Sequence, residues 1–139
     1  MTTLDDAILL AAQAHRGQKD RAGAPYILHP LRVMLRLKTE EEMMVAVLHD
    51  VVEDSAFALA DLERTGFPPH VVEAVDCLTR REGETYEAFI ERIKPNSLAR
   101  RVKLADLEDN LDIRRLPQLG EKDLARLQRY LAAQASLTS

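Results

Sequence analysis

Apolar residues recur at spacings of three and four along almost the whole chain, which is the pattern of amphipathic helices. The first such segment begins with Thr3 and Asp6, a capping-box pair, and its apolar positions continue to a stop at Gly17. Further helices are expected over 30–37, from 39 through the segment AVLHDVVEDS at 46–55, before 66, after 69, over Tyr86–Ile93, over 97–116 and after 120. Glycine and proline fall almost entirely between these segments, and no segment alternates as a strand would. The sequence therefore predicts an all-α fold, a compact bundle of about seven or eight helices, with sites where different helices converge.

The last predicted helix carries Leu124, Leu127 and Leu131 on one stripe. Leu131 and Leu137 are spare apolar residues on this helix, and they would permit self-association. The sequence therefore allows a homo-oligomer.

Length and composition indicate one soluble globular domain. A chain of 139 residues suits a single core, so one domain is expected to span residues 1–139. Hydrophobic residues make up 46% and charged residues 30%, which is the composition of a folded soluble protein. The longest apolar runs, at 7–12 and 43–48, are far shorter than the ~20 residues that cross a bilayer, so no membrane association is expected.

Net charge and cysteine content indicate which binding partners and which cellular compartment to expect. The net charge is −4 and basic residues gather only in short patches, such as 100–101 and 114–115, which argues against a nucleic-acid partner but not against a small anion. The N-terminal segment carries acids where an export signal needs basic residues. The single cysteine, Cys77, has apolar neighbours typical of a packed thiol and cannot form an internal disulfide. A cytoplasmic location is therefore expected.

The segment AVLHDVVEDS places ionisable residues where a buried helix should be apolar. Burying such a group without a partner costs several kcal/mol, so His49, Asp50, Glu53 and Asp54 need something among them that makes them tolerable. On one continuous helix, Glu53 follows His49 by four residues and Asp54 follows Asp50 by four, so all four share one side. A divalent cation is the simplest group that would hold them together.

Two further residues extend this candidate metal site. His29 precedes Pro30 at the start of a predicted helix, and Asp106 sits in VKLADL, in the middle of another, where aspartate is a poor helix former. Two histidines and two aspartates, with positions left for water and substrate, suit Mn²⁺, Fe²⁺ or Mg²⁺ better than a closed structural zinc site.

Five segments carry a resemblance to a known family. They are HRGQ at 15–18, GAPYILHPLRV at 23–33, AVLHDVVEDS at 46–55, a GF followed by an apolar helix at 66–78, and VKLADLEDN at 102–110. In this order they resemble the HD superfamily of metal-dependent phosphohydrolases. Within it, they are similar to the hydrolase domain of the RelA/SpoT family and to the small stand-alone alarmone hydrolases.

The resemblance implies a fold, an activity and a set of site residues. It implies an HD helical bundle that removes the 3′-pyrophosphate of (p)ppGpp, which gives GDP or GTP. Its metal would be Mn²⁺, held by His29, His49, Asp50 and Asp106. Glu53 and Asp54 match the acidic pair that orients or deprotonates the attacking water, and Asn110 matches an asparagine near the nucleotide. Beside this, positive charge in the loop from Arg16, Lys19 and Arg21 could face the phosphates.

The chain departs from the family's pattern at positions that usually face the substrate. Asp20 and Ala22 lie in a loop segment that usually carries a basic pair, and Asp20 replaces an arginine that packs against the guanine. Leu107, Asp109, Asp112 and Ile113 occupy positions that are usually basic, imidazole or hydroxyl.

Three hypotheses about the substrate follow from these departures. The chain hydrolyses (p)ppGpp and grips it differently, through Arg21, Arg80 or Arg81. Alternatively, it applies the same metal chemistry to a different phosphorylated nucleotide. The third reading is a non-catalytic sensor of a metal or nucleotide, against which the intact acidic pair argues.

Overall fold

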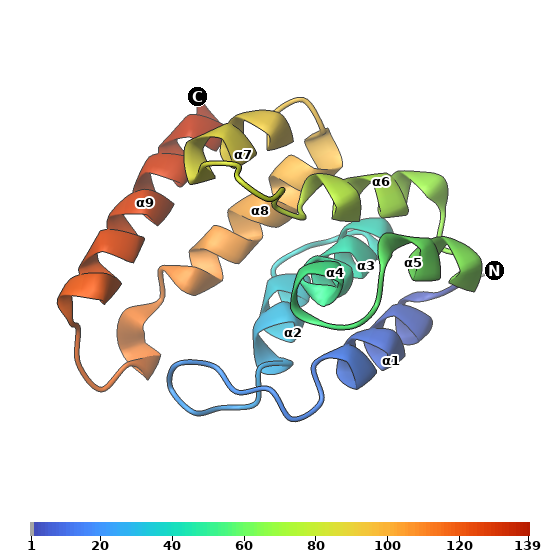
Figure 1. Ribbon diagram of the computed structural model, residues 1–139, viewed down its shortest axis with the longest axis horizontal. Helices are drawn as coiled ribbons and strands as arrows, with labels where there is room; N and C mark the ends of the chain where they lie inside the picture. The colour runs from blue at the N-terminus through green and yellow to red at the C-terminus, as the bar shows by residue number, and fades with distance from the viewer. Residues whose placement is uncertain (1) are drawn as a thin grey trace.

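The computed structural model describes residues 2–139, and this part of the chain contains nine α-helices, one short 3-10 helix and no β-strand (Figure 1). The all-α prediction is confirmed. The elements are α1 (Leu4–Ala14), α2 (Leu28–Leu35), α3 (Glu40–Leu48), α4 (Val51–Asp54), α5 (Leu59–Thr65), α6 (Pro69–Cys77), α7 (Tyr86–Ile93), α8 (Ser97–Asn110), η1 (Ile113–Arg115) and α9 (Glu121–Thr138).

Local capping interactions set most helix boundaries where the sequence predicts them. Thr3 and Asp6 form the complete capping box that opens α1. The Thr85 side chain accepts a hydrogen bond from the Ala88 backbone N–H, and α7 begins at the next residue, Tyr86. Gly66 ends α5 with a φ of +98°, a left-handed conformation that only glycine adopts without strain.

Three predicted helices differ from the structure. The helix expected over 30–37 runs from Leu28 to Leu35, so His29 lies inside it and not before its start. The helix expected from 39 through 55 is divided, because α3 ends at Leu48 and α4 begins after a turn at His49 and Asp50. The His49 imidazole bonds the Ala46 carbonyl, the acceptor that the residue-50 N–H would use in a continuing α-helix. The helix expected over 97–116 ends at Asn110 instead, and the 3-10 helix that follows is separate. The division of the helix expected from 39 through 55 adds one helix to the predicted number.

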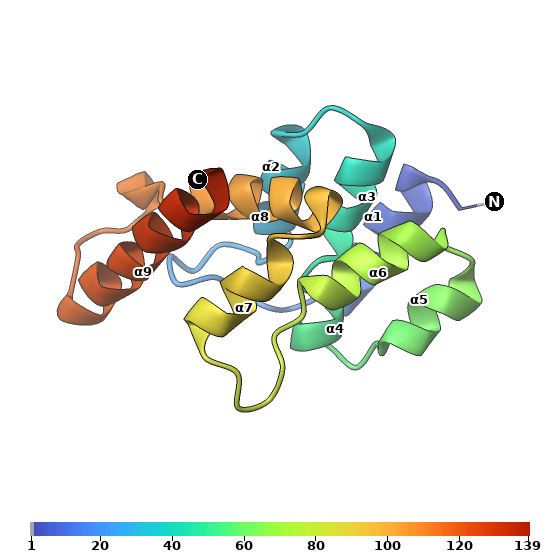
Figure 2. The same cartoon turned by 90° about the horizontal axis from the view of Figure 1, so that it is seen from above.

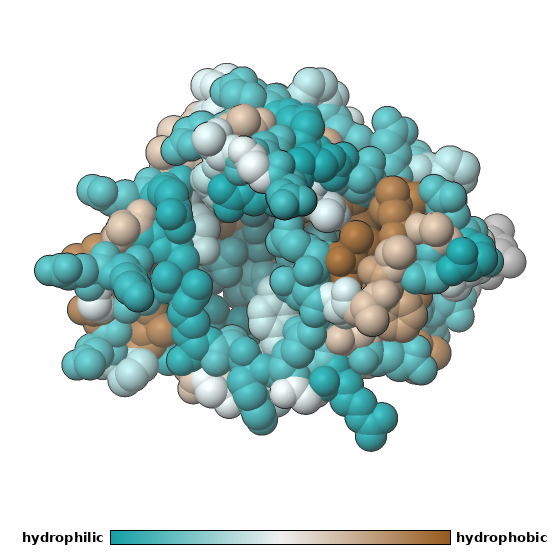
Figure 3. Space-filling model, viewed as in Figure 1, coloured by the Kyte–Doolittle hydropathy of each residue, from teal (hydrophilic) through white to brown (hydrophobic). Residues whose placement is uncertain are grey.

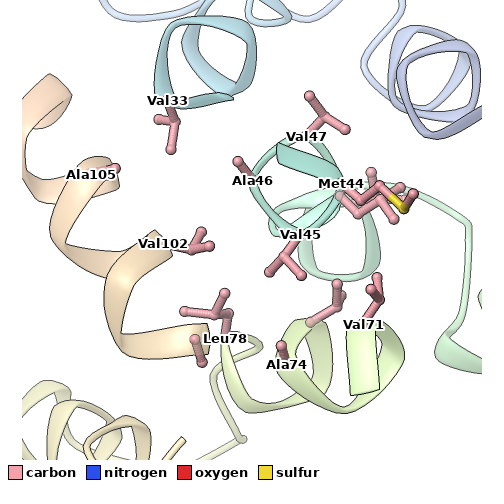
Figure 4. Packing of buried hydrophobic residues seen from close by; sticks show 14 of the residues in the cluster. Val33, Met44, Val45, Ala46, Val47, Val71, Ala74, Leu78, Val102 and Ala105 are labelled. Atoms are coloured by element: carbon pink, nitrogen blue, oxygen red, sulfur yellow. The ribbon is translucent and has the colours of Figure 1, made fainter. Parts of the chain in front are cut away.

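The core surrounds α3, which lies between α1, α2, α6 and α8. Five successive residues of α3, at 44–48, are buried, so every face of this helix contacts protein. Figure 4 shows the apolar side chains that meet there: Val45, Ala46 and Val47 from α3, Val33 from α2, Val71 and Ala74 from α6, and Val102 and Ala105 from α8. Each fully buried Val or Leu contributes about 1.5–3 kcal/mol, so the end of α3 is held firmly in place.

The last helix, α9, packs mainly along α8 and α7, at one side of the molecule (Figure 2). Its buried residues are Ala133 and Leu137, whereas Leu124 and Leu131 are exposed. Leu131 is therefore exposed, as a spare apolar residue would be, but Leu137 is a core residue and not a spare one. Within residues 2–139, α9 included, no helix combines the length and the apolar composition that crossing a membrane requires.

Candidate active site

The four expected metal ligands converge from three parts of the fold. His29 comes from α2, His49 and Asp50 from the turn between α3 and α4, and Asp106 from α8. The His49 Nε2 atom lies 3.1 Å from Asp50 Oδ2 and 3.3 Å from Asp106 Oδ1. The His29 Nε2 atom lies 2.8 Å from Asp106 Oδ1 and 3.9 Å from Asp50 Oδ2.

The donor set of this cluster fits a divalent cation. Ligand atoms of His29, His49 and Asp50 all lie within 4.8 Å of one another, and Asp106 adds a carboxylate beside both imidazoles. In both histidines Nδ1 has a partner outside the cluster, so that Nε2 faces inward. An imidazole fixed through one nitrogen and open at the other is the usual arrangement of a metal-binding histidine.

The electrostatics of the cluster favour positive charge. Burial lowers the pKa of His29, but hydrogen bonds with Asp106 and Asp109 outweigh it and raise the pKa to about 9. The pKa of His49 is likewise raised, because Asp50 and Asp106 outweigh burial. Burial raises the pKa of Asp50, yet His49 lowers it to about 2. The carboxylates that stabilise the protonated imidazoles would also attract a divalent cation, which competes with those protons for the histidine nitrogens.

Lys103 is a residue of the site that the sequence interpretation missed. Its ammonium Nζ lies 2.8 Å from Asp106 Oδ2, and its side chain is buried beside the Phe89 and Tyr86 rings, 5.3 Å and 5.7 Å from their centroids. Burial lowers the pKa of Lys103, but Asp106 raises it by more, so the ammonium stays charged. The signal was available, because a lysine three residues before an interior aspartate shares its helix face.

The acidic pair lies at the edge of the cluster. Carboxylate oxygens of Asp50, Glu53 and Asp54 are within 4.8 Å of one another. This proximity arises from the turn before α4, not from one continuous helix as predicted. The Glu53 Oε1 atom accepts a hydrogen bond from the Arg80 backbone N–H at 2.9 Å. Burial and the charges of Asp50 and Glu53 raise the pKa of Asp54 to about 6.

A cleft of about 480 Å³ opens over this cluster. Figure 3 shows the hollow between α9 and the rest of the molecule, with mostly hydrophilic side chains around it. All three expected substrate-binding residues, Lys19, Arg21 and Asn110, line the cleft, and so does Arg80. Arg81 instead pairs with Asp76. A cleft of this volume can hold a nucleotide-sized ligand.

The wall formed by α9 was not predicted. It contributes Asp123, Arg126, Leu127 and Tyr130 to the cleft. The sequence contained no signal that α9 folds back beside the metal cluster, because that placement depends on packing against α7 and α8. A larger hollow, of about 680 Å³, lies by the first turns of α3 and α8, and none of the four expected metal ligands lines it.

Some departures from the family pattern have structural roles in the loop and at the end of α8. The Asp20 Oδ1 atom accepts hydrogen bonds from the Ala22 and Ala24 backbone N–H groups, both at 2.9 Å, and so shapes the loop before α2. Asp20 and Ala22 both line the cleft. Asp112 lines the cleft too, but its carboxylate is paired with the Arg114 guanidinium at 2.7 Å and 2.8 Å.

Other departures do not face the cleft at all, so the expectation that they do is wrong for them. Leu107 is fully buried in the apolar core. Asp109 is fully buried behind His29 and bonds the Arg32 guanidinium. Ile113 is partly exposed and is not among the residues that line the cleft. Asp109 therefore adds less negative charge around a substrate than the sequence suggests.

The segment before α2 supports the cluster through side-chain contacts. The buried His15 ring packs 4.9 Å from the Tyr26 ring, and its Nδ1 lies 2.9 Å from Gln18 Oε1. The Tyr26 hydroxyl donates a hydrogen bond to Asp50 Oδ2 at 2.6 Å. The Gln18 amide donates to the Asp54 backbone carbonyl at 2.8 Å, which ties this loop to α4. His15 therefore supports the loop beside the cluster and is not one of the residues that converge in it.

Two known proteins are similar to this chain over most of its length. No protein-family model matches the chain. The bifunctional (p)ppGpp synthase/hydrolase SpoT of Escherichia coli K12 is 31% identical over 123 residues, which cover 78% of this chain. The GTP pyrophosphokinase of Streptomyces coelicolor is 36% identical over 118 residues, again 78% of this chain. The chain spans only 17% and 14% of the lengths of these two relatives.

A solved structure agrees over nearly the entire chain. It is described as a metazoan ortholog of SpoT that hydrolyzes ppGpp, and it superposes with a TM-score of 0.80 at 26% identity. The match covers 99% of this chain and 85% of the other. Together with the convergence of His29, His49, Asp50 and Asp106, these likenesses show that the chain is an HD-type hydrolase-like domain of the RelA/SpoT family.

Proposed function

We propose that this chain is a divalent-cation-dependent phosphohydrolase, that its ion is Mn²⁺, and that it converts (p)ppGpp to GDP or GTP and pyrophosphate. Residues 1–139 act as a single hydrolase domain in this proposal. The observation that carries it is the nitrogen–oxygen cluster at the base of a nucleotide-sized cleft, with two further carboxylates beside it. The substrate is taken from a similar protein, a guanosine-3′,5′-bis(diphosphate) 3′-pyrophosphohydrolase, and from the structural neighbour, which hydrolyzes ppGpp.

The mechanism assigns a task to each group of residues. His29, His49, Asp50 and Asp106 would hold the ion. When bound, a divalent cation polarises phosphoryl oxygens and lowers the pKa of a nearby water molecule.

The acidic pair at the cleft edge is placed to orient the attacking water and take its proton. The pKa of Asp54, about 6, leaves this carboxylate ionised at neutral pH but still basic enough to accept a proton, and Glu53 is held beside it by the Arg80 N–H. The water oxygen forms a bond to phosphorus as the bond from phosphorus to the ribose 3′ oxygen breaks, and that oxygen takes up a proton.

The cleft walls supply contacts for the rest of the substrate. Lys19 and Arg21 bring positive charge from the loop before α2, and Arg80 brings it from the opposite side, after α6. These cations suit the 5′ phosphates and the leaving pyrophosphate. The Asn110 amide donates to Asp106 Oδ1 at 3.3 Å and lines the cleft, which supports a role for it in contacting a nucleotide beside the cluster.

A second candidate, the same chemistry on another phosphorylated nucleotide, is favoured by the composition of the cleft. Asp20 stands where the family packs an arginine against guanine, and its carboxylate is committed to the loop backbone. Asp112 and Asp123 add acids to the wall, although each is paired with an arginine. A cleft of this kind has less positive charge available for a tetraphosphorylated guanosine.

The test is a hydrolysis screen of the purified protein after chelation and reloading with Mn²⁺. The substrates are ppGpp, pppGpp and common nucleoside phosphates, and the products are identified. Release of GDP and pyrophosphate from ppGpp supports the first candidate, and turnover of another nucleotide alone selects the second. No turnover of any of them, with Mn²⁺ bound, indicates a non-catalytic sensor and contradicts both.

A pair of variants separates binding from chemistry. Asp106→Ala is expected to lose Mn²⁺. Glu53→Gln is expected to retain Mn²⁺ and to slow hydrolysis by roughly 10²- to 10⁴-fold, because the amide still accepts the Arg80 hydrogen bond but cannot take a proton. Glu63→Gln, an exposed glutamate on α5, is the matched control. Full activity in Glu53→Gln would show that Glu53 does not act on the water.

A further inference from the structure

Asp109 is a buried carboxylate placed behind one of the candidate metal ligands. It lies on α8, and its side chain is fully buried. The Oδ2 atom is 2.7 Å from His29 Nδ1, on the side of the imidazole that faces away from the cluster. The opposite nitrogen, His29 Nε2, is 2.8 Å from Asp106 Oδ1. The His29 ring is therefore held at both nitrogens by carboxylates of the same helix.

Arginine side chains fix the Asp109 carboxylate in this position. Arg32 Nε donates to Oδ1 at 2.8 Å and Arg32 Nη2 donates to Oδ2 at 3.1 Å, a two-point contact that sets the plane of the carboxylate. Guanidinium nitrogens of Arg36 and Arg115 lie 3.7 Å from its oxygens. Because Arg32 and His29 both belong to α2, the pairing joins α2 to α8 at the level of the site.

The two histidines of the cluster are oriented by different means. The Nδ1 atom of His49 bonds the Ala46 backbone carbonyl, a partner that no side-chain substitution at another position removes. The Nδ1 atom of His29 depends on the side chain of Asp109. A carboxylate acceptor at Nδ1 selects the imidazole tautomer whose free lone pair is on Nε2, and it makes that nitrogen a stronger ligand than a carbonyl acceptor does.

We propose that Asp109 is a positioning residue that fixes the ring orientation and the tautomer of His29, so that Nε2 is presented to a divalent cation. This inference rests on the metal site of the proposed function. It also gives a role to a residue whose charge, read from the sequence alone, suggests repulsion of an anionic substrate.

The experiment compares Asp109→Asn with the wild-type protein by isothermal titration of the chelated protein with Mn²⁺. Asparagine keeps the size and one acceptor oxygen but loses the charge, and Mn²⁺ affinity is expected to fall by about 10- to 100-fold. Asp112→Asn, an acid on the cleft wall that contacts neither histidine, is the matched control and is expected to bind Mn²⁺ as the wild type does. Equal affinity in Asp109→Asn and wild type would overturn the inference and leave the metal site standing.

A second measurement needs no variant. Long-range ¹H–¹⁵N spectra of the wild-type protein loaded with diamagnetic Zn²⁺ report which nitrogen of His29 carries the proton. A proton on Nδ1 supports the inference, and a proton on Nε2 overturns it even if Asp109→Asn fails to fold. Failure of the wild type itself to bind Mn²⁺ contradicts the proposed function, and the inference with it, which distinguishes that outcome from failure of the positioning role alone.

Discussion

Replacing Lys103 by methionine tests whether the buried ammonium stabilises the cluster through Asp106. Three donors, from His29, His49 and Asn110, contact the Oδ1 atom of Asp106. Lys103 is the hydrogen-bond donor that the described part of the chain provides to Oδ2. Methionine keeps the length of the lysine stem and its packing against the Phe89 and Tyr86 rings, so the change removes charge without opening a cavity.

The expected loss of stability in Lys103→Met follows from the ion pair that Asp106 loses. Breaking a buried ion pair on one side costs about 3–5 kcal/mol, because the remaining charge stays buried without compensation. Asp106 keeps its contacts with His29 and His49, which places this case near the lower end, at about 3 kcal/mol. For a chain of this size, such a loss lowers the melting temperature by roughly 10 °C.

The assay is thermal unfolding, followed by circular dichroism, in a chelator and again in Mn²⁺. Lys94→Met is the matched control, since Lys94 and Glu91 form another pair three residues apart at 2.8 Å, but on the surface. Exposed pairs contribute little to stability, so this control should melt close to the wild type. A bound divalent cation replaces the missing positive charge beside Asp106, so Mn²⁺ should stabilise Lys103→Met by more than it stabilises the wild type.

One result would refute this reasoning. If Lys103→Met and Lys94→Met melt at the same temperature in the chelator, burial does not determine how much the Lys103–Asp106 and Lys94–Glu91 pairs contribute to stability. Equal stabilisation of Lys103→Met and wild type by Mn²⁺ would show instead that the ammonium and the cation do not act on the same carboxylate.

Three further predictions concern Glu84, Leu62 and Tyr26. Arg92 lowers the pKa of Glu84 from its ordinary 4.5 to about 2, so the ionised Glu84 stabilises the folded state. In urea titrations, the difference in free energy of unfolding between wild type and Glu84→Gln should be largest above pH 4.5 and should disappear as the pH falls toward 2. A difference that does not change with pH would contradict the pairing. Leu62→Ala, at a fully buried position, should cost about 3 kcal/mol in the same titrations, and a loss below about 1 kcal/mol would show that the site collapses around the smaller residue. Tyr26→Phe removes the hydrogen bond to Asp50 and should weaken Mn²⁺ binding about tenfold by calorimetry; unchanged binding would show that the hydroxyl does not orient this carboxylate.

The parts of the fold that local rules govern could be predicted from the sequence. Thr85 and Gly66 act through their own neighbours in the chain, so the start of α7 and the end of α5 follow from residue type and spacing alone. The convergence of His29 with Asp106 was expected from the family resemblance and from an aspartate among interior residues in the middle of a helix, and the two side chains lie 2.8 Å apart.

The features that sequence reasoning missed depend on contacts between distant segments. The turn at His49 could not be predicted, because the apolar residues before and after it keep helical spacing. The hydrogen bond between the His49 side chain and the Ala46 carbonyl ends α3 there. Asp109 could not be separated from a substrate-facing acid, because only the packing of α2 on α8 brings Arg32 and His29 to it. Tyr130 reaches the cleft only because α9 folds back along α7 and α8.

The position of α3 has a consequence for how this protein can change over generations of mutation. Two of the candidate ligands, His49 and Asp50, follow directly after the buried last five residues of α3, so a change of side-chain volume at 44–48 shifts the backbone that carries them. Selection for foldability and selection for catalysis therefore act on the same segment, the end of α3 and the turn after it, and cannot be satisfied separately there. Mutations that change substrate preference are better tolerated in α9 and in the loop before α2, because these segments line the cleft and can vary without disturbing the core around α3.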